Sequence, residues 1–345
     1  MGNESQVEGI FNAFERYIET EDNFSLITHY NPDPDAIGGA FALSYLLNKK
    51  FSKNCKCYYC GIIGRAENKS LINILDIELI CVQSLDILND TKIILLDSQP
   101  GSGNNPLDKH HIPYICFDHH PLREDTATVN FADIRLDHGS TCTIIYSYFK
   151  AFGIKPTVNV ATALYYGIES DVVGEGRTTN KLDIEYLDEL SKFINREKLH
   201  QIENPKLPYD YYTHIFKGVN NSVVYDDYLI TSLGEIDNPD YIGEVADFLI
   251  RFEKVFLVLV VGVFDNVIRL SFRSQRKKYD AGELIKKIIG NYGSGGGHST
   301  NSGGQIILND KEEATKVSKK IITKSLSIIK NKIISGVPFL SLKDY

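Results

Sequence analysis

The strongest constraint on the fold is a regular alternation of short apolar runs and helical patterns over the first 170 residues. The strand-like runs lie at 24–28, 56–59, 93–96 and 114–117, and the helical patterns lie at 36–49, 140–152 and 158–170. Short apolar strands that alternate with helices are typical of a parallel sheet with helices on both faces. The sequence therefore predicts an α/β N-terminal domain of this type.

The second half predicts a smaller α/β domain with a mixed sheet. Strands are expected at 228–233, 255–264, 267–272 and 305–308, and helices at 242–252, 281–291 and 311–334. Asp265-Asn266 is suited to a tight hairpin turn between two of these strands. For the 345 residues we expect an N-terminal domain at 1–190, a helical linker at 191–222 and a C-terminal domain at 223–345.

Charge narrows the class of ligand. The formal net charge is -8 and the pI is about 5.6. Proteins that hold long nucleic acids neutralise many phosphates with Lys and Arg, so we expect no long duplex as a partner. A small anion can still bind an acidic chain if the positive charge is local or comes from metals.

Neither a secretory signal nor a membrane span is predicted. Met1–Thr20 is polar and contains acidic residues, without an apolar core region. The longest apolar run, Val255–Phe264, is too short to cross a bilayer and fits a buried strand. We therefore expect a cytoplasmic protein with no membrane partner. The oligomeric state is left open, with a homodimer among the options.

The cysteines suggest a structural zinc site only weakly. Cys55, Cys57 and Cys60 form a C-x-C-x-x-C cluster, but no second pair of Cys or His ligands lies nearby in sequence. We interpret the cluster as part of a strand in which these residues act as small apolar side chains.

Acidic and imidazole side chains follow the predicted strands. Because ligands of parallel α/β sheets bind outside the carboxyl ends of the strands, we expect these groups to share one edge. The side chains concerned are His29, Asp33, Asp97, Asp118, His119 and His120. The pattern predicts a metal site at this edge of the sheet.

The segment His29–Gly39 places three potential ligands, His29, Asp33 and Asp35, between a strand and a helix. Pro32 and Pro34 keep the backbone extended around Asp33, and Gly38 and Gly39 are expected to let a phosphate approach the helix start. In the alternative, the aspartates only cap the helix. A single Asp is enough for a cap, so that alternative leaves His29 and the second Asp unexplained.

Three further elements complete the candidate centre. Asp97 ends an apolar strand, although such a residue can also be a helix cap. The adjacent His119 and His120 after Asp118 point to opposite sides, so that one can bind a metal while the other faces the substrate. Asp171 is expected to close the site, with Glu169 as its competitor.

The segment from Gly293 to Gly304 is the main signal of the second half. Glycines permit close backbone approach, and Gly295, Gly296 and Gly297 followed by His298 suggest an anion-binding turn rather than a flexible linker. Arg273 ends a strand upstream and is suited to grip a phosphate. For the nearby Lys277 and Lys278 we favour a solvated strand end.

The first four elements resemble, in order, the four motifs of the DHH phosphoesterase superfamily, which includes manganese pyrophosphatases, single-strand exonucleases and the nanoRNase and pAp-phosphatase group. The Arg273 strand end with the Gly-Gly-Gly-His segment is similar to the DHH-associated C-terminal domain. Two departures concern the substrate pocket: Pro34 stands where many members have Gly between the aspartates, and Glu169-Ser170-Asp171 stands where many have Thr-Asp-Thr.

The resemblance implies a two-metal phosphoesterase whose site lies between the domains. One cation would bind His29, Asp33 and Asp97, and the other Asp35, Asp97, His119 and Asp171. Mixed His and carboxylate ligands suit Mn²⁺, with Zn²⁺, Co²⁺ and Mg²⁺ left open. Asp118 would orient an imidazole and His120 would contact the phosphate or leaving group, which makes His120, Asp118 and Asp97 the predicted catalytic residues. Arg273 and the segment Gly295–His298 would hold the far phosphate.

The expected substrates are short oligonucleotides or small phosphorylated nucleotides, such as nanoRNA, pAp or linear dinucleotides. A single-strand exonuclease is the first alternative, and it would need a basic groove lined by aromatic residues. A nucleotide-binding module without catalysis is the second, although every ligand residue type is present. Pyrophosphatases of the superfamily have a different C-terminal domain, which makes that activity a weaker hypothesis.

Overall fold

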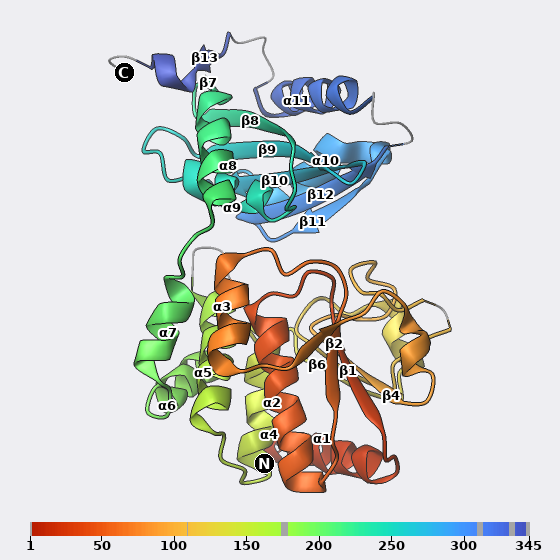
Figure 1. Ribbon diagram of the computed structural model, residues 1–345. Helices are drawn as coiled ribbons and strands as arrows, with labels where there is room; N and C mark the ends of the chain where they lie inside the picture. Colours follow the sequence, from red (N-terminus) through yellow and green to blue (C-terminus); the bar gives the residue numbers. More distant parts are fainter. Residues whose placement is uncertain (1, 109, 174–178, 309–312, 331–334, 343–345) are drawn as a thin grey trace. The chain divides into compact units, whose positions relative to one another are not determined.

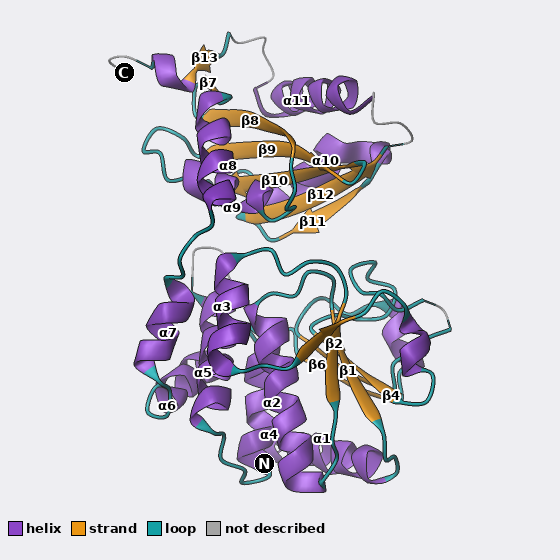
Figure 2. Cartoon of the chain, in the orientation of Figure 1, coloured by secondary structure: helices purple, strands orange, loops and turns teal. Residues whose placement is uncertain are grey.

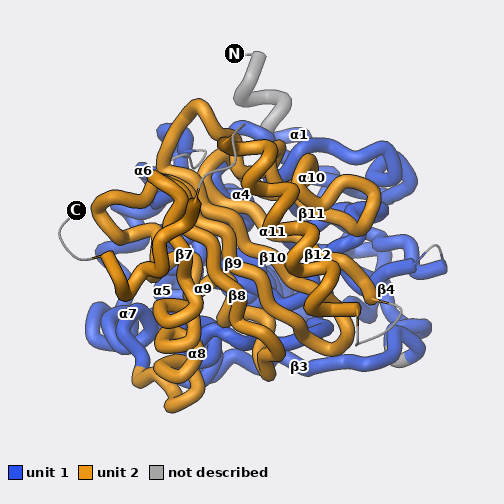
Figure 3. The backbone as a smooth tube through the Cα atoms, turned by 90° about the horizontal axis from the view of Figure 1, so that it is seen from above, with its two compact units in different colours: residues 1–205 blue, residues 206–345 orange. Residues whose placement is uncertain are grey.

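The computed structural model describes residues 2–108, 110–173, 179–308, 313–330 and 335–342. The chain divides into two compact units, residues 1–205 and 206–345, which are coloured separately in Figure 3. The division falls inside the segment 191–222 that the sequence assigns to a linker. Each unit has its own sheet and its own core.

The first unit contains a six-stranded sheet with the strand order β3-β2-β1-β4-β5-β6, in which every neighbouring pair is parallel (Figures 1 and 2). The strands are β1 (Phe24–Thr28), β2 (Lys56–Tyr59), β3 (Leu79–Cys81), β4 (Lys92–Leu96), β5 (Ile115–Asp118) and β6 (Phe131–Ile134). The predicted α/β class with a parallel N-terminal sheet is confirmed.

Alternate strand residues enter two different cores. Leu26 of β1 belongs to the core formed with α1, α2 and α4, whereas its neighbour Ile27 packs on the other face with Leu88 of the 3₁₀ helix η1. The helices are α1 (Gly2–Glu19), α2 (Pro34–Phe51), α3 (Ala66–Leu75), α4 (Thr141–Ala151), α5 (Val158–Val172), α6 (Lys181–Leu190) and α7 (Arg196–Glu203), with η1 at Leu85–Leu88 and η2 at Glu124–Thr128. Burial on both faces explains why the central strands read as continuous apolar runs.

The order of strand addition creates a switch point between β1 and β4. After β1 the chain adds β2 and β3 on one side, and it then returns to add β4, β5 and β6 on the other side. In open α/β sheets the crevice at such a point, outside the carboxyl ends of the strands, is where ligands bind. His29 follows β1 and Asp97 follows β4, so the two residues lie at the switch point.

Gly38 and Gly39 are both buried within α2. A Cβ atom on Gly38 would lie 2.7 Å from the carbonyl oxygen of Ala163 in α5, closer than real Cβ contacts. On Gly39 the same atom would lie 3.8 Å from Thr141 Cγ2, an ordinary contact. Gly38 therefore allows α2 and α5 to pack closely behind the site.

The second unit contains a seven-stranded sheet in the order β11-β12-β10-β9-β8-β7-β13. The strands are β7 (Val223–Tyr225), β8 (Tyr228–Glu235), β9 (Leu257–Phe264), β10 (Val267–Ser274), β11 (Ser294–Gly297), β12 (Asn301–Ile307) and β13 (Val337–Pro338). The β8–β9 pair is parallel and the other pairs are antiparallel, so the predicted mixed sheet is confirmed. Asp265 and Asn266 form the predicted turn and both have positive φ, as tight hairpins require.

Helices cover both faces of the second sheet. They are α8 (Tyr209–Asn220), α9 (Tyr241–Leu249), α10 (Ala281–Ile289) and α11 (Ala314–Lys330), with 3₁₀ turns η3 at Gly290–Tyr292 and η5 at Phe339–Ser341. Residues of α9 join one core and residues of α10 and α11 join the other. Residues 311, 312 and 331–334 of the predicted last helix lie outside the described residues. Among the helices that are described, none is both long enough and apolar enough to cross a membrane.

Candidate metal centre

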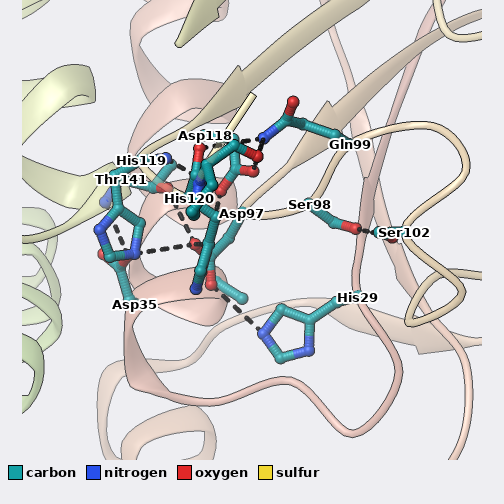
Figure 4. Close-up of polar contacts among 12 residues, drawn as sticks. His29, Asp35, Asp97, Ser98, Gln99, Ser102, Asp118, His119, His120 and Thr141 are labelled. Carbon is teal, nitrogen blue, oxygen red and sulfur yellow. Dashed lines mark hydrogen bonds and ion pairs between the residues drawn. The ribbon is translucent and has the colours of Figure 1, made fainter. Parts of the chain in front are cut away.

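The predicted ligands of the first unit converge at the carboxyl edge of the parallel sheet (Figure 4). His29 follows β1, Asp97 follows β4, and His119 and His120 follow Asp118, the last residue of β5. Asp33 and Asp35 stand at the start of α2, and Asp171 stands in the last turn of α5. Because β1, β4 and β5 are adjacent and parallel, their C-terminal residues are brought to the same place.

Potential ligand atoms gather in overlapping groups in which all atoms lie within 4.8 Å of one another. The groups are His29, Asp33 and Asp97; Asp35, His119 and Asp171; and Asp97, His119 and His120. Asp97 occurs in two of the groups and lies between them, with His29 Nε2 at 3.3 Å from its Oδ2 atom and His119 Nε2 at 3.5 Å from its Oδ1 atom. The geometry offers two places for a cation that share Asp97.

His29 and His119 are oriented in the same way. His29 Nδ1 lies 2.8 Å from the carbonyl oxygen of Tyr30, and His119 Nδ1 lies 3.3 Å from that of His138. A carbonyl oxygen can only accept, so in both rings Nδ1 carries the proton and Nε2 faces the carboxylates. Histidines that bind metals have this second hydrogen bond, which fixes the tautomer and the ring orientation.

The Nε2 atom of His119 is the clearest indication that a cation fits here. This atom is buried and has no hydrogen-bond partner among the described residues. It lies 3.9 Å from Asp35 Oδ2, 3.5 Å from Asp97 Oδ1 and 3.6 Å from Asp171 Oδ2. Burial lowers the pKa of His119 below its ordinary value, which favours the neutral imidazole that metal binding requires. The residues present therefore fit a divalent cation.

Asp35 is a fully buried carboxylate. Burial raises its pKa well above the ordinary value, and the charges of Asp97 and Asp171 raise it further. Among the described residues, Asp35 forms no ion pair with Lys or Arg, whereas the amides of Thr141 and Cys142 at the start of α4 donate to it. A cation would supply the positive charge that this buried group needs.

His29 lies between two carboxylates. Burial opposes its charged form, but hydrogen bonds and Coulomb attraction from Asp33 and Asp97 outweigh burial and hold the pKa of His29 well above its ordinary value. Asp33 also caps α2, because its Oδ1 atom accepts the N–H of Ala36 at 3.1 Å. Asp33 therefore caps the helix, as the alternative interpretation of the two aspartates states, whereas Asp35 faces α4.

The backbone at Asp97 is in the left-handed region, with φ of +56°. Side chains other than Gly, Asn and Asp are strained in this region, and such conformations concentrate at functional sites. The hydroxyl of Thr141 donates to Asp97 Oδ1 at 3.0 Å, and the side chain is 2% exposed. Its conformation and its contacts together direct both carboxylate oxygens toward the histidines.

Asp118 and His120 form a pair at the exposed side of the centre. Asp118 Oδ1 lies 2.8 Å from His120 Nδ1, and its Oδ2 atom accepts from Gln99 Nε2 at 2.6 Å. Burial opposes protonation of His120, but Asp118 and Asp97 outweigh burial and raise the pKa of His120 to about 9. The His120 side chain is 41% exposed, whereas that of His119 is 8% exposed, so His120 is the imidazole that can meet a substrate.

Two residues of this network were not predicted from the sequence. Gln99 is buried, and its Oε1 atom accepts from the Arg123 amide and the Thr126 hydroxyl while its Nε2 atom holds Asp118. Thr141 contacts both Asp35 and Asp97. Of the two acids considered for the end of α5, Asp171 joins the cluster, whereas Glu169 accepts a hydrogen bond from Tyr165.

The predicted glycine-rich turn of the second unit is in part a strand. Gly295, Gly296 and Gly297 belong to the edge strand β11, which pairs with β12. A Cβ atom on Gly304 of β12 would lie 2.1 Å from Ile289 Cδ1, so glycine there lets α10 pack directly against the strands. The prediction of an anion-binding turn over this segment is therefore wrong for its secondary structure.

His298 and Arg273 occupy different surroundings in this unit. His298 is exposed in the β11–β12 turn, where its carbonyl and that of Ser299 accept the amides of Gly282 and Ala281 at the start of α10. Arg273 is 9% exposed, and its guanidinium donates to Asp247 Oδ1 at 2.5 Å and to Ser271 Oγ at 2.7 Å.

Comparison with known proteins agrees with this architecture. Residues 23–168 match the DHH family, N-terminal domain, and residues 225–324 match the DHHA1 domain. An exopolyphosphatase-related protein from Bacteroides fragilis shares the fold with a TM-score of 0.71 at 18% sequence identity, over 93% of this chain and 98% of that chain.

Two sequence relatives cover different shares of the chain. An uncharacterized protein of Methanocaldococcus jannaschii is 35% identical over 312 residues, which are 88% of this chain and 63% of that protein. A probable manganese-dependent inorganic pyrophosphatase of Archaeoglobus fulgidus is 27% identical over 187 residues, 50% of this chain and 57% of that protein. The chain thus spans less than two thirds of the length of either relative.

The fold and the site define an α/β protein with a His and Asp cluster suited to divalent cations. The two domain matches show which domains the chain carries: a DHH family N-terminal domain in its first half and a DHHA1 domain in its second half. The resemblance drawn from the four motifs is confirmed.

Proposed function

We propose that this protein is a metal-dependent phosphoesterase that uses two divalent cations, preferably Mn²⁺, to hydrolyse short oligonucleotides or small phosphorylated nucleotides. The observation that carries the proposal is the buried His119 Nε2 atom, which faces three carboxylates and has no hydrogen-bond partner among the described residues. Mixed imidazole and carboxylate donors suit Mn²⁺.

The ligands are assigned from the group of His29, Asp33 and Asp97 and from the group of Asp35, His119 and Asp171, with Asp97 added to the second because it lies 3.5 Å from His119 Nε2. His29, Asp33 and Asp97 would hold one cation, and Asp35, Asp97, His119 and Asp171 would hold the other. When bound, such a pair lowers the pKa of a water and neutralises phosphoryl oxygens. The chain itself contributes fixed ligand orientations, through the carbonyls behind His29 and His119 and the α4 amides at Asp35.

His120 is assigned to the substrate side of the centre. Asp118 holds Nδ1 of His120, and we assign this imidazole to the phosphoryl group or the leaving oxygen. With its pKa raised to about 9, His120 keeps a proton at neutral pH and can donate a hydrogen bond to an anionic oxygen. Gln99 holds the other oxygen of Asp118 and so fixes the pair.

In the second unit we assign Arg273, Gly295, Gly296, Gly297 and His298 to the phosphate at the far end of the substrate. His298 is exposed in the turn between β11 and β12. Arg273 is held by Asp247, so its guanidinium is already oriented. The acidic net charge of -8 supports a small anion as substrate and not a long nucleic acid.

Hydrolysis of inorganic pyrophosphate is a second candidate function. The similarity to a manganese-dependent pyrophosphatase covers 50% of this chain and supports related metal chemistry. The DHHA1 match in the second half favours a nucleotide, since pyrophosphatases of the superfamily have a different C-terminal domain.

A substrate panel on metal-free protein tests the proposal. Protein treated with a chelator should lose activity, and Mn²⁺ should restore it toward di- to pentanucleotides or pAp. A preference for long single strands would indicate an exonuclease, and a preference for pyrophosphate would indicate a pyrophosphatase. Binding of nucleotides without turnover at any metal concentration would indicate the silent module, whereas full turnover in metal-free protein would exclude the two-metal mechanism.

A further inference from the structure

A second buried carboxylate lies outside the predicted ligand set. Asp183 of α6 is fully buried. Its Oδ2 atom accepts the amide of Gly139 at 2.9 Å, and its Oδ1 atom accepts the hydroxyl of Thr143 at 2.6 Å. No ion pair involving Asp183 occurs among the described residues. Its charge is therefore stabilised by hydrogen bonds, which fix the carboxylate and its donors relative to one another.

Helix capping explains only part of this arrangement. Asp183 forms a capping box with Asn180, in which the Asn180 amide donates to Asp183 Oδ2 at 2.8 Å and the Asp183 amide donates to Asn180 Oδ1 at 2.9 Å. A capping box consists of these two bonds. The bonds to Gly139 and Thr143 are additional, and they reach a segment about 40 residues earlier in the chain.

That earlier segment, residues 138–143, supports three members of the metal cluster. The supporting contacts are the carbonyl of His138 to His119 Nδ1, the amides of Thr141 and Cys142 to Asp35, and the hydroxyl of Thr141 to Asp97 Oδ1. Gly139 and Thr143, which bond to Asp183, lie on either side of Thr141 and Cys142. Asp183 therefore holds the segment at two points that bracket these contacts.

We propose that Asp183 is a positioning residue for the metal centre, acting through residues 138–143 on Asp35 and His119. The inference rests on the proposed function in one respect, namely that the cluster binds cations. If Asp183 acts in this way, the two proposed cation sites depend on residues 138–143 to different degrees. The group of Asp35, His119 and Asp171 depends on the segment, whereas His29 is fixed by the Tyr30 carbonyl.

The test is a calorimetric titration of metal-free protein with Mn²⁺. Asp183→Asn keeps the shape of the side chain, but its amide nitrogen cannot accept the hydrogen bonds that the carboxylate oxygens accept. We expect the affinity for one of two Mn²⁺ ions to fall about 10–100-fold, the usual effect of losing a residue that supports metal ligands. The affinity for the other ion should fall less, because only Asp97 of its assigned ligands contacts residues 138–143.

The matched control is Asn195→Ala. Asn195 caps α7 in the same unit by accepting the amide of Lys198, and no contact joins its side chain to residues 138–143 among those described. Loss of this cap should lower the stability of the protein, as loss of the Asp183 capping box would. Both Mn²⁺ affinities should remain at the wild-type values, so a general loss of stability can be separated from a loss of positioning.

Hydrogen exchange gives a readout that needs neither metal nor activity. In metal-free Asp183→Asn, the amides of Gly139, Thr141 and Cys142 should exchange faster than in wild type. Thr143→Val serves if Asp183→Asn does not fold, because it removes one bond to Asp183 and keeps the branched shape. Faster exchange with both Mn²⁺ affinities unchanged would overturn the positioning role. Absence of Mn²⁺ binding in the wild type would instead overturn the proposed function itself.

Discussion

The carboxylate of Asp35 accepts the backbone amide of Thr141 at 2.6 Å, although 106 residues separate them in the chain. The amide belongs to the first turn of α4, where the partial positive charge of a helix N-terminus stabilises an anion. The protein thus orients a buried negative group without help from a basic side chain among the described residues.

Asp97→Asn should reduce activity by orders of magnitude and leave the fold intact. Asn tolerates a positive φ, so the backbone conformation at +56° should be retained. The neutral amide, however, cannot bind two cations as a carboxylate can. Activity on a generic phosphodiester and the circular dichroism spectrum check this. Asp76→Asn is the matched control, because Asp76 is exposed, has φ of +59° and lies outside the cluster. Retained activity in Asp97→Asn with two bound cations would show that Asp97 does not bridge them.

Gly38→Ala should destabilise the protein, whereas Gly39→Ala should be tolerated. The added methyl at Gly38 would lie 2.7 Å from the Ala163 carbonyl oxygen and would force α2 away from α5, at a cost of about 1–3 kcal/mol. At Gly39 the methyl meets ordinary contacts, and alanine favours a helix by up to about 1 kcal/mol. Urea unfolding measures both free energies. A rise in KM without loss of stability in both variants would instead support phosphate approach at these glycines.

His298→Ala should impair a short nucleotide with a distal phosphate and spare bis-p-nitrophenyl phosphate. Losing a charge-assisted phosphate contact costs about 1.5–3 kcal/mol, and the generic substrate has no distal phosphate. Arg273→Ala should have the same selective effect. The measurement is the ratio of kcat/KM for the two substrates in variant and wild type. Equal losses on both substrates would place the residue in the catalytic centre or in a structural role.

Asp247→Ala separates two explanations for Arg273. If Arg273 has only a structural role, Asp247→Ala and Arg273→Ala should both lower the free energy of unfolding and neither should change substrate preference. If Arg273 holds a phosphate, Asp247→Ala should affect the nucleotide less than Arg273→Ala does.

The cysteines within and beside β2 should behave as protonated thiols and bind no zinc. Cys57 is buried in the strand and burial raises its pKa to about 12; burial likewise raises the pKa of Cys55 to about 12. A raised pKa keeps a thiol protonated, so both should resist a thiol reagent at pH 8, where the exposed Cys81 reacts. Mass spectrometry of the labelled protein identifies the sites. Stoichiometric zinc released on labelling would show that the cluster binds metal.

Convergence of the ligands was predictable because parallel pairing leaves little freedom. Once the apolar runs before His29, Asp97 and His119 are recognised as strands of one parallel sheet, their carboxyl ends must share an edge. The supporting residues were not predictable in this way. Thr141 and Asp183 act through hydrogen bonds to residues 40 or more positions away, and no local pattern marks such pairs.

The glycines show a different limit of sequence reasoning. A glycine can indicate a ligand-binding site, a turn or a close contact between elements. Gly38 allows a close contact, because it faces the α5 backbone. Gly295–Gly297 were not predicted as a strand because glycine disfavours strands, and here pairing with β12 supplies the conformation. The strand β3 of three residues was too short to show a period.

The switch point between β1 and β4 has a consequence for how such proteins diverge. The assigned ligands follow the three adjacent strands β1, β4 and β5 or lie on α2 and α5, and no assigned ligand follows the edge strands β3 and β6. Strands and loops at both borders of the sheet can therefore change in length and composition while the cluster stays in place.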